Sequence, residues 1–228
     1  MRIRTITFLI LLITCSVIQA QNLIPNGDFE QYSGCPDYEG QIDSALYWKN
    51  PTSVNNGGGT SDYLNQCATS GSFVGIPENG LGYQPARSGA GYGGILLYVL
   101  AAASYREYIE TPFTSPLVAG SCYHFEMYIN LANNCYFNTD DIGIYFSNTL
   151  ISGITNDDPL PFLPQLNNTA GNFPDTLNWT LVSGNYTAAG GESYLIIGNF
   201  KDDASTNVVI ANNAFLTAAY FYIDDVSL

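Results

Sequence analysis

Acidic side chains stand in two short segments at opposite ends of the chain, Asn22–Glu30 (NLIPNGDFE) and Tyr220–Leu228 (YFYIDDVSL). Each segment is expected to be a β-strand, and pairing of the two would bring Glu30 close to Asp224. Alternation along a strand places Asp224 on the side of its apolar neighbours, so its carboxylate should be partly buried. A buried carboxylate needs a partner, and Ca²⁺ prefers carboxylate and carbonyl oxygens. The sequence therefore predicts a structural calcium ion here, with solvated strand-end acids as the alternative.

A second group of residues could bind a ligand from one face of a strand. Cys122–Leu131 (CYHFEMYINL) alternates, so one face should enter the core while the polar and aromatic face stays accessible. The segment Gly75–Tyr92 reads as a long loop, and loops of this length are often functional. A sugar-binding surface needs aromatic rings and a few fixed polar groups. The candidate ligand-binding residues are His124, Glu126, Tyr128, Tyr83, Arg87 and Tyr92.

The sequence supports catalysis less than it supports ligand binding. His124 is the only histidine, and neither a GxSxG nor an HExxH motif is present. A glycosidase would need two carboxylates facing each other about 5–10 Å apart, for which Glu107, Glu110 and Glu126 are the available strand residues. We therefore expect a non-catalytic protein, with a glycan-active enzyme as the minor alternative.

The first twenty residues, Met1–Ala20, have the layout of a secretory signal peptide. Basic residues precede an apolar centre, and a small residue, Ala20, ends the segment. Acylation of Cys15, as in a lipoprotein, is an alternative. No later run has the length of a transmembrane helix. We expect a secreted or cell-surface protein in which residues 21–228 form a single domain.

Charge narrows the range of partners. Residues 21–228 hold all 20 acidic side chains but only four of the six basic ones. This excess of acidic side chains argues strongly against nucleic acid as a partner, because few cations are present to displace counterions from its phosphates. The excess of acidic over basic side chains also disfavours binding to an anionic membrane surface. It suits a divalent cation and a neutral ligand such as a glycan.

Four cysteines lie beyond residue 20, and an even number in a secreted chain predicts disulfide bonds. Three connectivities are possible. Sequence order favours Cys35–Cys67 and Cys122–Cys135.

The remaining sequence is strand-like nearly throughout. It is rich in Tyr, Phe and β-branched residues, with Gly- or Asn-rich breaks at short intervals and no long amphipathic helix. Ile95–Ser104 is ambiguous, although its flanking segments favour a buried strand. The pattern predicts an all-β fold, a two-sheet antiparallel β-sandwich of jelly-roll type.

Four segments carry a family resemblance: the two end segments, WTLVSGNYTA at Trp179–Ala188 and YLIIGNF at Tyr194–Phe200. Together they resemble the galactose-binding-like jelly rolls, with carbohydrate-binding modules of the family 4/9 type as the nearest named group. Middle blocks such as CPDYEG and YREYIE resemble secreted or surface modules of Bacteroidetes. Many of those modules are joined to an OmpA-like or sorting domain, which this chain is expected to lack. The resemblance implies structural calcium at Glu30 and Asp224, and more weakly at Asp28.

The sequence thus predicts a secreted, non-catalytic module that binds a carbohydrate or another cell-envelope component. The alternative from a different class is a structural or adhesion protein at the cell surface. In that case the faces of the sandwich would bind protein partners without recognising sugar.

Overall fold

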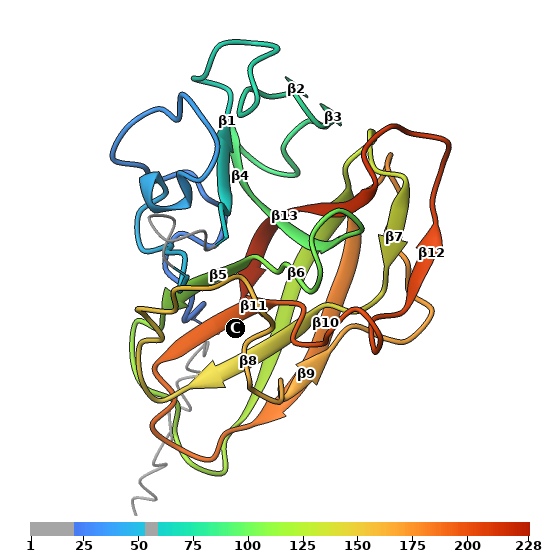
Figure 1. Ribbon diagram of the computed structural model, residues 1–228. Coiled ribbons are helices and arrows are strands. Elements are labelled where there is room, and N and C mark those ends of the chain that lie inside the picture. Colours follow the sequence, from blue (N-terminus) through green and yellow to red (C-terminus); the bar gives the residue numbers. More distant parts are fainter. Residues whose placement is uncertain (1–20, 53–58) are drawn as a thin grey trace, which may run out of the picture.

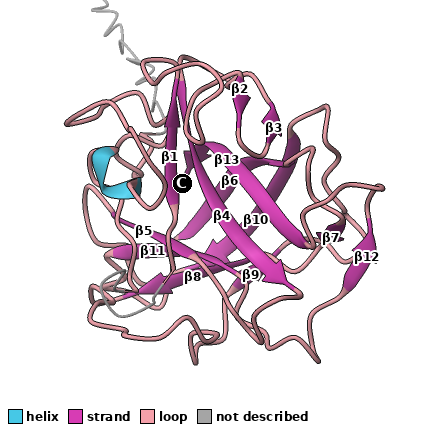
Figure 2. Cartoon of the chain, turned by 45° about the horizontal axis from the view of Figure 1, so that its top comes forward, coloured by secondary structure: helices cyan, strands magenta, loops and turns pink. Residues whose placement is uncertain are grey.

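The computed structural model describes residues 21–52 and 59–228, so the predicted signal peptide and the alternative at Cys15 lie outside the described residues. Strands dominate this part of the chain, and its helical structure is a single 3-10 turn, η1 (Ile42–Ser44) (Figure 2). Within the described ranges, no helix is long and apolar enough to cross a membrane.

The predicted strand Cys122–Leu131 is present with the same bounds. The ambiguous Ile95–Ser104 run lies in a strand up to Val99, and the Gly75–Tyr92 loop contains a short hairpin. The strands are β1 (Asp62–Asn65), β2 (Glu78–Asn79), β3 (Gly82–Tyr83), β4 (Gly91–Val99), β5 (Tyr108–Pro112), β6 (Cys122–Leu131), β7 (Phe137–Thr139), β8 (Gly143–Ser147), β9 (Leu166–Asn167), β10 (Thr180–Thr187), β11 (Tyr194–Gly198), β12 (Val208–Ile210) and β13 (Ala218–Ser227).

Two antiparallel sheets pack together as a sandwich (Figure 1). The larger sheet has the order β1-β4-β13-β6-β10, and the smaller has the order β5-β11-β8-β9. Strands β4, β5, β6, β8, β10, β11 and β13 fall alternately in the two sheets, which is the chain path of a jelly roll. The predicted all-β sandwich is confirmed.

The core lies between these sheets and follows the predicted alternation of β6. Phe125, Met127 and Ile129 are buried on the inner face. Between the sheets, the Phe146 ring of β8 stacks on the Tyr186 ring of β10 with 4.2 Å between centroids. Apolar side chains that alternate along each strand therefore build the contact that holds the sandwich together.

The N-terminal segment differs from its prediction, because Asn22–Glu30 forms turns and not a strand. Asn26 and Phe29 have φ angles of 52° and 57°, in the left-handed region that interrupts extended backbone. Strand β13 is already paired on both sides, by β4 and β6, and so offers no free edge.

The two ends of the described chain nevertheless lie side by side, as predicted. The Leu23 amide donates to the Leu228 carbonyl (3.0 Å), and the Val226 amide donates to the Gly27 carbonyl (2.8 Å). A Cβ at Gly27 would stand 1.9 Å from the Val226 carbonyl oxygen, so this close approach requires glycine.

One of the two predicted disulfides is present. Cys35 and Cys67 are bonded, with 5.8 Å between their Cα atoms. The predicted Cys122–Cys135 bond is wrong, because Cys122 is exposed and Cys135 is buried, each with a free thiol. Cys122 begins β6 and Cys135 follows its far end, so an extended strand of about 3.3 Å per residue holds them apart.

Candidate functional site

An open groove of about 540 Å³ lies where the N-terminal segment, β6 and the end of β13 meet. It is mostly polar, and it brings three predicted ligand-binding residues (Arg87, Glu126 and Tyr128) together with the predicted metal ligand Asp28. The groove residues are Asn22, Ile24, Asn26, Gly27, Asp28, Gln31, Arg87, Glu126, Tyr128, Asp225, Val226 and Ser227.

Arg87 occupies the centre of the polar contacts in this groove. Its guanidinium lies 3.3 Å from the centroid of the Tyr128 ring and pairs with the Asp225 carboxylate. Burial opposes its charge, but the hydrogen bond and charge of Asp225 raise the pKa of Arg87 above its ordinary value. A ligand in the groove would therefore meet a fixed cation over Tyr128, and the aromatic face itself would be partly covered.

The two aspartates at the end of β13, Asp224 and Asp225, lie in different environments. The pairing of β13 with β6 shifts register between Asp224 and Ser227, and Asp225 has a φ angle of 49°. Such a bulge re-aims side chains locally. Asp224 is buried, whereas Asp225 lines the groove, where it also accepts a hydrogen bond from the Ser88 hydroxyl (2.6 Å).

His124 lies beside the groove but does not line it. Its Nδ1 is 2.8 Å from Asn185 Oδ1, and its Nε2 is 3.1 Å from Glu126 Oε1. These hydrogen bonds, first that with Asn185 and then that with Glu126, raise the pKa of His124. His124 thus orients the Glu126 carboxylate of the groove. Both residues lie on the outer face of β6, as the alternation along this strand predicted.

The two remaining predicted ligand-binding residues lie elsewhere. Tyr92 is buried, and its hydroxyl donates to the Gln84 carbonyl (2.9 Å), so the prediction that its ring offers a binding platform is wrong. Alternation along β4 turns this ring into the core. Tyr83 is 60% exposed but belongs to a separate pocket of about 290 Å³.

The predicted metal ligands Glu30 and Asp224 both accept hydrogen bonds from the segment that leads into β4 and from its first residue. Glu30 Oε1 accepts hydrogen bonds from the amides of Ala90 (2.7 Å) and Gly91 (2.8 Å). Asp224 Oδ2 accepts from the Arg87 amide (2.8 Å). Burial, followed by the charge of Asp225, raises the pKa of Asp224 to about 8.

Asp28 stands apart from this pair, since its exposed side chain lines the groove. Among the described residues, no three His, Cys, Asp or Glu side chains are grouped to hold a metal ion. Any cation bound by Glu30 and Asp224 would therefore need backbone carbonyls or water for the rest of its coordination.

The three glutamates considered for glycoside hydrolysis do not face one another. Glu107 is buried and accepts hydrogen bonds from the amides of Thr60 and Leu96 (2.9 Å each). Glu110 lies in the smaller sheet and lines its own pocket, whereas Glu126 lies in the larger sheet and lines the groove. This set therefore lacks the geometry of a carboxylate pair across a glycosidic bond.

No protein-family model matches the chain, and no curated protein sequence matches it. Among solved structures, the CBM22-1 xylan-binding domain from Paenibacillus barcinonensis Xyn10C is similar over 88% of each chain, with 11% identity and a TM-score of 0.44. The K2 cleaved adhesin domain of Lys-gingipain is similar over 87% of this chain and 95% of its own, with 12% identity and a TM-score of 0.44.

A third similar structure is TmCBM61 in complex with β-1,4-galactotriose. The similarity covers 91% of this chain and 97% of that chain, with 10% identity and a TM-score of 0.39. Similarities as distant as these carry no functional argument.

Proposed function

We propose that this chain is a secreted or surface-exposed, non-catalytic module that binds a carbohydrate or another hydroxyl-rich component of the cell envelope. The supporting observation is the polar groove. Asp28, Glu126 and Asp225 supply acceptors, Arg87 supplies donors, and the part of the Tyr128 ring that Arg87 does not cover supplies aromatic surface. Hydroxyl groups both donate and accept hydrogen bonds, so they match this mixture. The excess of acidic residues disfavours polyanionic ligands.

A glycan array followed by titration of the best ligand tests this proposal. Tyr128→Ala and Glu126→Gln are each expected to weaken binding at least tenfold, about 1.4 kcal/mol, because the first removes an aromatic ring from the groove and the second replaces a carboxylate acceptor with a neutral amide. Tyr83→Ala is the matched control, since this exposed tyrosine lies in another pocket, and it should leave affinity unchanged. Binding that ignores both groove variants, with folding verified by circular dichroism, would contradict the assignment.

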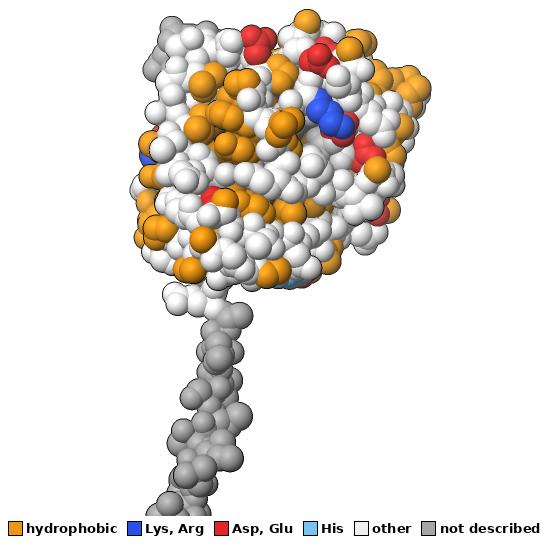
Figure 3. Space-filling model, turned by 90° about the horizontal axis from the view of Figure 1, so that it is seen from below, with side chains coloured by type: hydrophobic (Ala, Val, Ile, Leu, Met, Phe, Trp, Pro, Cys, Tyr) orange, Lys and Arg blue, Asp and Glu red, His pale blue; other side chains and the backbone are white. Residues whose placement is uncertain are grey.

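The alternative role as a protein-binding adhesin is favoured by exposed apolar side chains. Hydrophobic side chains gather on one face of the molecule (Figure 3). Contiguous apolar surface often marks a protein interface. A stoichiometric protein partner recovered from cell-surface extract, together with a blank glycan array, would favour this role over the first.

We also propose that Glu30 and Asp224 hold a structural Ca²⁺ ion. Both hydrogen bonds to Glu30 fall on Oε1, which leaves Oε2 for a metal. Asp224 is fully buried, while the nearby cation, Arg87, pairs with Asp225. A buried carboxylate with a raised pKa gains from a cation that favours its ionised form. Backbone carbonyls and water would complete the coordination.

Calcium is therefore expected to stabilise the chelator-treated protein, by about 2.7 kcal/mol at a concentration one hundred times its Kd. Thermal unfolding with and without CaCl₂ measures this, and Asp224→Asn should abolish the response. Asp43→Asn, at an exposed aspartate, is the matched control. An unchanged midpoint in the unmodified protein, with no calcium found by elemental analysis, would refute the site.

A further inference from the structure

The polar groove beside β6 carries more negative than positive charge. Among the described residues that line it are three carboxylates, those of Asp28, Glu126 and Asp225, but only one guanidinium, that of Arg87. Arg87 is already paired with Asp225 and lies over the Tyr128 ring. The carboxylates of Asp28 and Glu126 therefore have no cationic partner among the described lining residues.

Asp28 and Glu126 reach the groove from two different elements, each joined to the end of β13. The Val226 amide donates to the carbonyl of the residue before Asp28 (2.8 Å), and Ser227 pairs with Glu126 of β6. Both carboxylates are accessible, since Asp28 is exposed and the Glu126 side chain is 39% exposed. A ligand in the groove can therefore reach either of them.

Protonation of His124 would not remove this excess of negative charge. The His124 ring lies between Asn185 and Glu126, at 2.8 Å from Asn185 Oδ1 and 3.1 Å from Glu126 Oε1. An imidazolium would offset the charge of Glu126, whose Oε2 still faces no described donor. Asp28 belongs to the N-terminal segment and would keep its charge uncompensated.

The arrangement of the carboxylates favours an organic cation over a metal ion. In the described part of the chain, Asp28, Glu126 and Asp225 are not grouped to hold one ion. An ammonium group has three donors and can pair with one carboxylate at a time. A neutral ligand would displace water from the carboxylates without supplying a counter-charge, and an anion would be repelled. Positive charge on the ligand is therefore favourable in this groove.

Neutral polar groups in the groove indicate that such a ligand also carries hydroxyls. The Gln31 amide and the Ser227 hydroxyl line it, and within the described ranges neither side chain makes a hydrogen bond. Both groups can donate to and accept from a hydroxyl. We propose that the groove binds an amino sugar, a glycan with free amino groups, whose ammonium groups pair with Asp28 and Glu126. This inference rests on the proposed function and specifies the class of its ligand.

Three β-1,4-linked trisaccharides, of glucosamine, N-acetylglucosamine and glucose, test this inference, because they differ only in an ammonium, acetamide or hydroxyl group at C2. At about pH 7 most of the amines are charged, since an α-amino group has a pKa of about 7.7–8.0. Titration calorimetry is expected to give the glucosamine trisaccharide a Kd at least about fivefold lower than that of either neutral one. Added salt should reduce this difference, because it screens exposed charges.

Two variants that remove charge and keep side-chain size locate the effect. Asp28→Asn and Glu126→Gln should each reduce the preference for the glucosamine over the glucose trisaccharide by about threefold or more. Both side chains are accessible, so neither change should disturb folding. Asp43→Asn, at an exposed aspartate outside the groove, is the matched control and should keep the preference.

Several results would overturn the inference. They are an affinity for either neutral trisaccharide that equals or exceeds that for the glucosamine trisaccharide, no binding of the latter, or a preference unaltered in both groove variants. Trilysine that binds as tightly would show that the groove selects charge without recognising a sugar, and would also overturn it. The proposed function would still stand if another glycan from the array binds and loses affinity in Tyr128→Ala, and it fails if no glycan does.

Discussion

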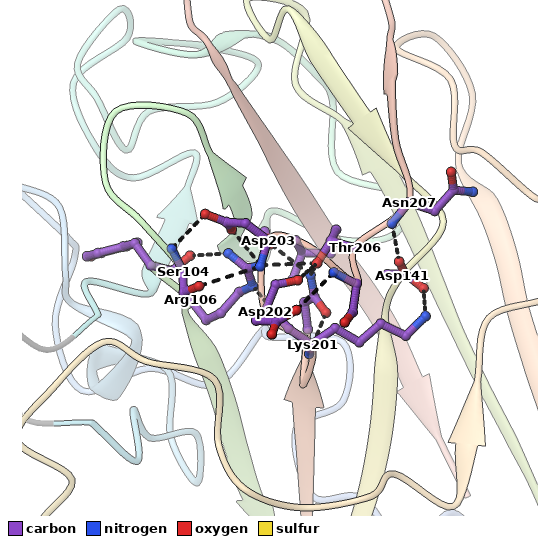
Figure 4. Close-up of polar contacts among 12 residues, drawn as sticks. Ser104, Arg106, Asp141, Lys201, Asp202, Asp203, Thr206 and Asn207 are labelled. Carbon is purple, nitrogen blue, oxygen red and sulfur yellow. Dashed lines mark hydrogen bonds and ion pairs between the residues drawn. The ribbon is translucent and has the colours of Figure 1, made fainter.

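Replacing Arg106 by methionine is expected to lower the free energy of unfolding by roughly 3–5 kcal/mol. The guanidinium is fully buried and donates to the carbonyls of Lys201 (3.0 Å) and Tyr105 (2.8 Å), and to the Asp203 carboxylate (2.9 Å) (Figure 4). These hydrogen bonds connect the loop after β11 to the segment before β5. Methionine fills similar space but leaves these acceptors without their donor.

Chemical denaturation of the two proteins measures this loss, and Lys201→Met in the same cluster is the matched control. The Lys201 ammonium also pairs with a carboxylate, that of Asp141, but its side chain is 48% exposed. Exposed ion pairs contribute about 0–1 kcal/mol, so this variant should change stability little. Equal effects of the two substitutions would show that burial of Arg106 does not determine its contribution.

The sandwich can be predicted from the sequence because apolar and polar residues alternate along its strands. Strand β6 shows both the use and the limit of this pattern. One face of Cys122–Leu131 enters the core, as expected from period two. Asn130 on the other face is also buried, because its amide donates to the Asp175 and Asn178 carbonyls of the segment before β10. Alternation therefore assigns a side, but only tertiary packing decides whether that side is covered.

The groove was less predictable, because its residues meet through long-range contacts. Arg87 and Asp225 are 138 positions apart, and no local pattern relates them. The bulge that turns Asp225 outward appears only in strand pairing. Tyr92 was assigned to the wrong environment. The composition of the Gly75–Tyr92 segment predicts a loop with an exposed ring, whereas β4 begins at Gly91 and the Tyr92 ring is buried. Residue types identified the chemistry, but strand boundaries and pairing determined where it could act.

The protein is expected to become less stable as the pH rises from about 5 to about 8. Asp62 is buried, and desolvation together with the charge of Glu107 raises its pKa to about 8. Burial likewise raises the pKa of Glu107. In the unfolded chain an aspartate titrates near 3.9. Between these two values the folded state holds more protons than the unfolded state, so stability falls with rising pH and levels off above the folded pKa.

Each such carboxyl contributes a slope of up to about 1.4 kcal/mol per pH unit. Urea unfolding at several pH values, with chelator present so that calcium does not contribute, measures the slope. Asp62→Asn keeps an acceptor for the Gly40 amide and cannot ionise, so it should reduce the slope, to which Asp224 and Glu107 also contribute, and exceed the unmodified protein in stability at pH 8. Asp43→Asn, at an exposed site, should reproduce the original profile. A slope unaltered by Asp62→Asn would mean that this carboxyl is ionised in the folded core, held there by Gly40 and the hydroxyl of Tyr220.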